Sequence, residues 1–143
     1  MSRLLGFNEI KHITQPCGKS CYSTCVAMAL GLDPIEVIDE LKERGCEPPY
    51  FNNDILKYLV TKNIYADRID CSMASLLVVG KTHLVCVPSK ANPVSFHSIV
   101  VCSNEDREFL ILDPNKGSDG RYAHRDFEEN KIIFLQTHAL YEC

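Results

Sequence analysis

Four polar residues occur along this 143-residue sequence in an order that suits nucleophilic catalysis: Gln15, Cys21, His97 and Asp113. A thiolate attacks carbonyl carbon atoms. It needs a base, a group that orients the base, and donors for the charge that develops on the carbonyl oxygen. On this interpretation Cys21 is the nucleophile, His97 the base and Asp113 the residue that orients the imidazole. The side-chain amide of Gln15 could donate to the oxyanion together with the backbone N–H of Cys21.

Cys21 has the best position for a reactive thiol among the eight cysteines. Ser20 is a good helix N-cap and Gly31 suits the other end, so the residues between them predict a helix that starts at or near Cys21. The positive end of the helix dipole favours a thiolate at that position.

Two further helices are predicted in the first half of the chain. Asp33 followed by Pro34 is typical of a helix start, and Gly45 is a suitable end for that helix. Asn53 could cap a third helix, because the apolar residues that follow it keep helical spacing on one face.

The rest of the chain is rich in β-forming residues. Strands are expected at 64–69, with a helical turn at 72–77 after it, and then at 83–87, 96–102, 108–112 and 131–137. The polar residues between the third and fourth of these strands predict a hairpin. His97 lies in the first strand of this hairpin and Asp113 ends the second, so antiparallel pairing would bring them together at one edge of the sheet.

The order of helices first and strands second predicts an α+β fold, in which an N-terminal helical half packs on a C-terminal antiparallel sheet. The length favours a single domain that spans 1–143.

Composition argues against several classes of function. The 15 Lys and Arg are outnumbered by 19 Asp and Glu, and no basic block occurs, so nucleic-acid binding is not expected. No apolar run reaches the roughly 18–20 residues of a membrane-spanning helix, and the N-terminus lacks the apolar region of a signal peptide. The cysteines are therefore expected to be mostly free thiols in a reducing compartment, which predicts a cytoplasmic protein. No cofactor is expected.

The segments around the candidate residues resemble the papain-like cysteine peptidases. They resemble more specifically the C39 group, which processes bacteriocin leader peptides, and its standalone relatives. The segments are Gln15-Pro16-Cys17-Gly18-Lys19-Ser20-Cys21-Tyr22, Phe96-His97-Ser98-Ile99-Val100-Val101 and Ile111-Leu112-Asp113-Pro114. The resemblance spans residues 15 to about 135. It implies a papain-like fold, the same four roles for Gln15, Cys21, His97 and Asp113, and a polypeptide substrate with small residues such as Gly-Gly before the scissile bond.

Several alternatives stay open from the sequence. The same thioester chemistry could deamidate a glutamine or transfer an acyl group, and a peptidase fold could bind a partner peptide without cutting it. The cysteines at 17, 21 and 25 are spaced four apart, which would suit a metal site if one helix carried all three, although Gly18 argues against that. A disulfide from Cys21 to Cys17 or Cys25 could also switch the nucleophile off. Each candidate residue also has a structural interpretation, such as a core histidine or a turn-forming aspartate.

Overall fold

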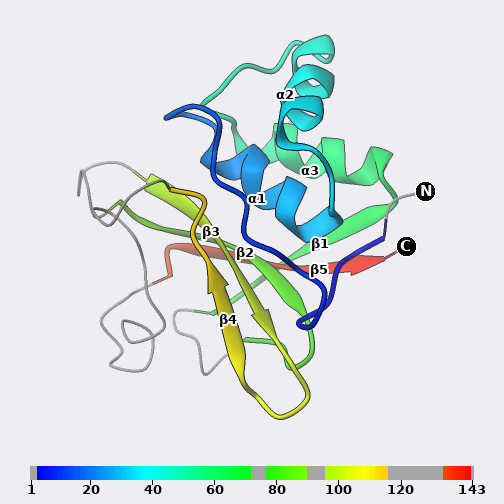
Figure 1. The fold of residues 1–143 in the computed structure, drawn as a ribbon, viewed down its shortest axis with the longest axis vertical. Coiled ribbons are helices and arrows are strands. Elements are labelled where there is room, and N and C mark those ends of the chain that lie inside the picture. Colours follow the sequence, from blue (N-terminus) through cyan, green and yellow to red (C-terminus); the bar gives the residue numbers. More distant parts are fainter. Residues whose placement is uncertain (1–2, 72–76, 90–95, 116–133, 143) are drawn as a thin grey trace.

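A computed structural model describes residues 3–71, 77–89, 96–115 and 134–142. Within these residues, three helices are followed by five strands (Figure 1). The helices are α1 (Cys21–Leu30), α2 (Pro34–Glu43) and α3 (Asn52–Thr61), and the strands are β1 (Ile64–Ile69), β2 (Thr82–Pro88), β3 (Phe96–Ser103), β4 (Phe109–Leu112) and β5 (Gln136–Glu142). The strands form one antiparallel sheet in the order β1-β5-β2-β3-β4. The α+β architecture predicted from the sequence is confirmed.

The residues at the helix ends explain why the helices begin and end where they do. The Asp33 carboxylate accepts hydrogen bonds from the backbone N–H groups of Ile35 and Glu36, which caps α2. Gly31 adopts the left-handed conformation with φ of 66°, and its N–H bonds back to the carbonyl of Ala27, which ends α1. The N-cap of α3 is Phe51 rather than the predicted Asn53, so this helix starts at Asn52, two residues earlier than a cap at Asn53 predicts.

The β3–β4 hairpin matches the prediction and carries two of the candidate residues. Val100 pairs with Leu112 and Ser103 pairs with Phe109. The turn between the strands is closed by a bond from the Asn104 N–H to the Glu108 carbonyl. Because β4 is the last strand in the order, residues that follow it lie at the rim of the sheet.

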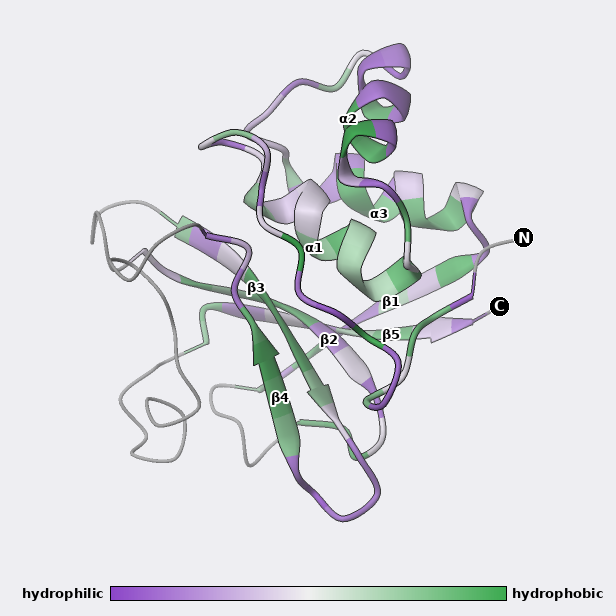
Figure 2. Ribbon diagram, in the orientation of Figure 1, coloured by the Kyte–Doolittle hydropathy of each residue, from purple (hydrophilic) through white to green (hydrophobic). Residues whose placement is uncertain are grey.

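The core lies on both faces of the sheet. Leu84, Val100 and Leu140 belong to the cluster that the helices cover, and α1 packs against β3. On the opposite face, Val85 and Ile99 belong to a smaller cluster. Figure 2 shows the apolar character of β3 and β4, in contrast with the hydrophilic tip of their hairpin. Successive side chains of a strand point to opposite faces, so the nearly continuous buried run along β3 is the expected pattern of a sheet that is covered on both sides.

The last strand differs from its prediction. Residues 131–137 were expected to form it. Of these, 131–133 lie outside the described residues, and the structure has β5 at Gln136–Glu142, where β1 and β2 flank it. Thr137, His138, Ala139 and Leu140 are all buried there, so pairing on both sides stabilises a segment of mixed polarity. The helical turn expected at 72–77 falls mostly on 72–76, outside the described residues.

No single helix in the described part of the chain has both the length and the apolar character needed to cross a membrane. The pair α1 and α2, bent by 116° relative to each other, passes that test only when the two are taken together.

Candidate active site

His97 and Asp113 meet at the rim of the sheet, as the hairpin predicted. The imidazole Nε2 lies 2.5 Å from Asp113 Oδ1, and both side chains are buried. The same carboxylate oxygen accepts a hydrogen bond of 2.9 Å from the backbone N–H of Asn115. The carboxylate is therefore held from two directions, and it fixes one ring nitrogen of His97.

Cys21 is the first residue of α1, and its thiol lies beside the side chain of His97, close enough for each group to shift the pKa of the other. Because Asp113 occupies Nε2, the ring nitrogen left for the thiol is Nδ1. Ser98, the neighbour of His97 on β3, also lies close to the thiol, and its polar groups lower the pKa of Cys21. The structure thus brings Cys21, His97 and Asp113 together.

The electrostatics of this group favour charged forms of Cys21 and His97. Burial tends to raise the pKa of Cys21, but the hydrogen bonds from His97 and Ser98 and the charge on His97 together lower it below the ordinary thiol value. Burial tends to lower the pKa of His97, but the bonds to Asp113 and Cys21 raise it to about 9. Both directions favour the thiolate–imidazolium form of the pair.

The start of α1 does not use the side-chain cap that Ser20 was expected to supply. The Ser20 hydroxyl donates to the carbonyl oxygen of Cys17 at 3.0 Å, and no side-chain hydrogen bond caps the helix. The first N–H groups of a helix have no partner within the helix, so they can donate to an anion. This leaves the Cys21 end of α1 suited to binding a negatively charged oxygen.

Gln15 lies near these residues, although its amide donates elsewhere. Its Nε2 donates to the carbonyl oxygen of Cys17 at 2.8 Å, and its Oε1 is buried without a hydrogen-bond partner. Its backbone N–H donates to the carbonyl oxygen of Pro114 at 2.8 Å, which ties the segment before α1 to the loop that carries Asp113. The amide has to turn before it can donate to an oxyanion at Cys21.

His12 is a neighbour of the site that no sequence pattern indicated. Its Nε2 lies 2.6 Å from the backbone carbonyl oxygen of Asp113, so the N-terminal segment contacts the same loop at a second point. No motif links a histidine at this position with Asp113, because the two lie 101 residues apart in the sequence.

A cavity of about 440 Å³ opens beside Cys21. Its lining comes from the start of α1, the segment before α3, and the neighbouring ends of β2, β3 and β5. Phe51 and Phe96 line it with 78% and 73% of their surface exposed, which is unusual for phenylalanine. A cavity with exposed aromatic side chains next to a nucleophile is a suitable place for a substrate chain.

Three polar residues at this cavity were also missed in the sequence. The Tyr22 hydroxyl donates to Asn52 Oδ1 at 2.9 Å, and Asn52 Nδ2 donates in turn to Gln136 Oε1. The three residues come from α1, α3 and β5, and all of them line the cavity. Only the strand register, which places Gln136 opposite Cys86, brings β5 to this point.

The arrangement of the other cysteines does not fit the metal interpretation. Cys17 precedes α1 and is exposed, whereas Cys25 is fully buried in the core. Within the described residues no three His, Cys, Asp or Glu side chains come together as a metal site. The seven cysteines described are free thiols, and the disulfide from Cys21 to Cys17 or Cys25 stays a prediction.

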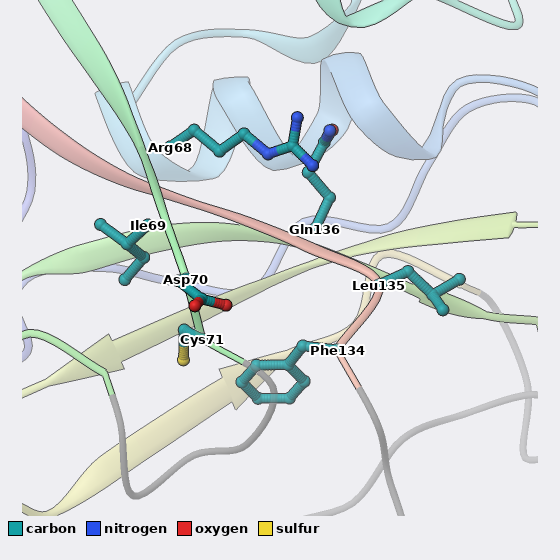
Figure 3. Close-up of a pocket in the computed structure, with 7 residues that line it drawn as sticks. All are labelled: Arg68, Ile69, Asp70, Cys71, Phe134, Leu135 and Gln136. Atoms are coloured by element: carbon teal, nitrogen blue, oxygen red, sulfur yellow. The ribbon is translucent and has the colours of Figure 1, made fainter.

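A second cavity, of about 400 Å³, lies where β1 ends and β5 begins, and Gln136 lines it as well (Figure 3). In this view Arg68 and Gln136 point to the same side of β5, whereas Cys71 and Phe134 lie on the other side. Gln136 therefore stands at the junction of the two cavities.

Comparison with known proteins adds a likeness of fold. No family model matches the chain, and no curated protein matches it. The fold is similar to that of a known protease. A solved structure, a double glycine motif protease from an AMS/PCAT transporter in complex with the leader peptide, aligns with a TM-score of 0.62. The alignment covers 94% of this chain and 91% of that one, at 17% sequence identity. The resemblance to C39 peptidases inferred from the sequence is thus confirmed for the fold.

Proposed function

We propose that this protein is a cysteine peptidase that uses Cys21 as nucleophile, His97 as acid and base, and Asp113 to orient His97. The observation that carries the proposal is the arrangement of three side chains at the 440 Å³ cavity, in which His97 is hydrogen-bonded to Asp113 and lies beside the Cys21 thiol. Each of the three groups has the partner that its role requires.

In the proposed reaction the Cys21 thiolate attacks the carbonyl carbon of a peptide bond. The negative charge moves to the carbonyl oxygen, where the Cys21 backbone N–H and the reoriented Gln15 amide stabilise it. The imidazolium of His97 then gives its Nδ1 proton to the leaving amine, and the C–N bond breaks to leave a thioester on Cys21. His97 accepts a proton from a water molecule that attacks the thioester, which releases the carboxylic acid and restores the thiolate.

The proposed substrate is a polypeptide that is cut after small residues such as Gly-Gly. The fold supports this proposal because the similar solved structure is a double glycine motif protease with a leader peptide bound. The exposed Phe51 and Phe96 beside Cys21 supply apolar surface for neighbouring parts of the peptide.

The first test is alkylation with iodoacetamide at mildly acidic pH, followed by peptide mapping of the modified cysteines. Cys21 should react well before the other cysteines in the wild type, and this advantage should disappear in His97→Ala. If Cys21 reacts no faster than the other cysteines, the proposed nucleophile is wrong.

The second test is cleavage of a synthetic peptide library that contains Gly-Gly, read by mass spectrometry. Cleavage that requires both Cys21 and His97 supports a peptidase. Release of ammonia from glutamine without chain cleavage would show a deamidase on the same residues. Binding without any turnover would show a peptide-binding module.

A further inference from the structure

The hydrogen bonds from Tyr22 through Asn52 to Gln136 have a direction. The tyrosine hydroxyl donates to the Asn52 carbonyl oxygen, which leaves the Asn52 amide nitrogen to donate to Gln136 Oε1. Because its oxygen is already an acceptor for Asn52, Gln136 presents its Nε2 as the free end of its amide. A side-chain amide nitrogen carries two N–H donors and no acceptor. The chain of bonds therefore sets the polarity of the group that Gln136 offers.

Gln136 lines the cavity beside Cys21. It is the first residue of β5, and its partner in the β2–β5 register is Cys86, which also lines the cavity. Cys86 in turn pairs with Ser98, which lies close enough to the Cys21 thiol to lower its pKa. The row from Cys21 on α1 therefore continues across three adjacent strands, through Ser98 on β3 and Cys86 on β2 to Gln136 on β5.

The rest of the cavity lining favours one kind of side chain. Its walls include the aromatic rings of Tyr50, Phe51 and Phe96, which suit an apolar stem. Burial raises the pKa of Cys86 to about 11, so this thiol stays neutral. Apart from the Cys21 thiolate, Lys19 is the one charged residue among those described along the lining, and none of them is Asp or Glu. A side chain with an apolar stem and a hydrogen-bond acceptor at its end matches these aromatic walls and the Gln136 Nε2 donor.

We propose that Gln136 is a specificity-determining residue, which donates a hydrogen bond from Nε2 to a carbonyl oxygen at the end of a long substrate side chain, as in glutamine or glutamate. This inference rests on the proposed peptidase function, because the substrate chain must pass Cys21 for its side chain to enter the cavity. Tyr22 and Asn52 are positioning residues that hold the Gln136 amide in this orientation.

The experiment uses peptide chloromethyl ketones, whose chloride is displaced by the Cys21 sulfur to form a stable thioether. The probes are acetyl-X-Gly-Gly and acetyl-Gly-X-Gly chloromethyl ketones, in which X is glutamine, leucine or lysine. Each rate of Cys21 modification, measured by peptide mapping, is divided by the rate with iodoacetamide, which has no peptide to bind. In the wild type, at one of the two positions, glutamine should react about fivefold faster than leucine, the effect of one hydrogen bond, and lysine should react more slowly than leucine.

Three variants separate the contributions. Gln136→Leu should abolish the preference for glutamine over leucine. Asn52→Asp removes the N–H that Gln136 Oε1 accepts, so the Gln136 amide should turn, offer its oxygen to the cavity and shift the preference from glutamine toward lysine. Asn53→Asp adds the same charge at the neighbouring exposed residue and is the matched control, which should keep the wild-type preference.

The outcomes distinguish this inference from the proposed function. If iodoacetamide modifies Cys21 no faster than other cysteines, the peptidase proposal fails. If Cys21 is selectively modified but glutamine and leucine probes react equally at both positions, or if Gln136→Leu keeps the preference, the role of Gln136 is wrong. An equal shift toward lysine in Asn52→Asp and Asn53→Asp would show a charge effect and would overturn the positioning role of Asn52.

Discussion

His97 Nε2 and Asp113 Oδ1 lie 2.5 Å apart, with only 9% and 4% of the two side chains exposed. A charge-assisted hydrogen bond in such a shielded place is stronger than one in water. It holds the imidazole in the tautomer that carries the proton on Nε2 when the ring is neutral, and it stabilises the charged ring. Nδ1 is then available to Cys21. Through His97, this bond therefore links Asp113 at the rim of the sheet to Cys21, the first residue of α1.

Replacing Asp113 by asparagine should lower kcat/KM by roughly 100-fold or more, since an amide can hold the imidazole in the wrong tautomer and does not stabilise its charge. The measurement is steady-state hydrolysis of the best peptide from the library, with circular dichroism to verify the fold. Asp106→Asn, an exposed aspartate in the β3–β4 turn, is the matched control and should behave as the wild type. Near-wild-type activity in Asp113→Asn would leave Asp113 only a turn-forming role.

The pH dependence of Cys21 alkylation should show that the thiolate forms below the ordinary thiol value of 9.0. In His97→Gln the hydrogen bond and charge of the imidazolium are lost while burial remains, so the inflection should move to higher pH. Hydrolysis should fall as pH rises through about 9, because His97 then loses the proton it gives to the leaving amine. Cys46, a partly exposed thiol far from this group in the sequence, is an internal reference in the same samples. An inflection that does not move in the variant contradicts the ion pair.

Gln15→Ala should lower kcat by roughly 100-fold, the effect of removing one oxyanion donor. Alkylation of Cys21 by iodoacetamide forms no oxyanion, so the loss in kcat should greatly exceed any loss in alkylation rate. The present contact of Gln15 Nε2 with the Cys17 carbonyl gives a second readout. A complex with a peptide aldehyde should have this amide turned toward the hemithioacetal oxygen. Equal losses in the two rates would show that Gln15 acts on the thiol or on the fold instead.

The sequence predicted the parts of the fold that depend on local signals. Asp33 and Gly31 mark helix ends through side-chain capping and a left-handed backbone, and both effects act within a few residues. The predicted hairpin also placed His97 close to Asp113, because two strands that are joined by a short turn pair with each other. These signals need no knowledge of distant parts of the chain.

What the sequence did not predict depends on contacts between distant segments. Gln136 reaches the cavity because β5 inserts between β1 and β2, an arrangement that no local pattern shows. His12 contacts Asp113 because the N-terminal segment crosses the molecule to the rim of the sheet. The composition of 131–137 predicted a strand that ends at Thr137, whereas pairing with β1 and β2 extends β5 to Glu142.

His83 shows a second kind of long-range constraint, outside the candidate site. Its side chain is fully buried on β2, with Nδ1 lying 3.1 Å from the Val101 carbonyl oxygen. Its Nε2 accepts a hydrogen bond from the Val78 N–H, so the ring must be neutral and carry its proton on Nδ1. Burial lowers the pKa of His83 to about 4, although backbone carbonyl groups partly offset this effect.

This buried histidine should make the protein less stable in mild acid. Between pH 6.5 and about 4 the unfolded chain binds a proton at His83 that the folded protein does not, so the free energy of unfolding falls as pH falls. The loss should reach roughly 3 kcal/mol near pH 4 and be absent above pH 7. Urea unfolding of the wild type and of His83→Gln at several pH values measures it. Glutamine can accept from Val78 and donate to Val101 without titrating, so the variant should lose less stability over this range. Parallel stability curves for the two proteins would mean that His83 is not the group that titrates.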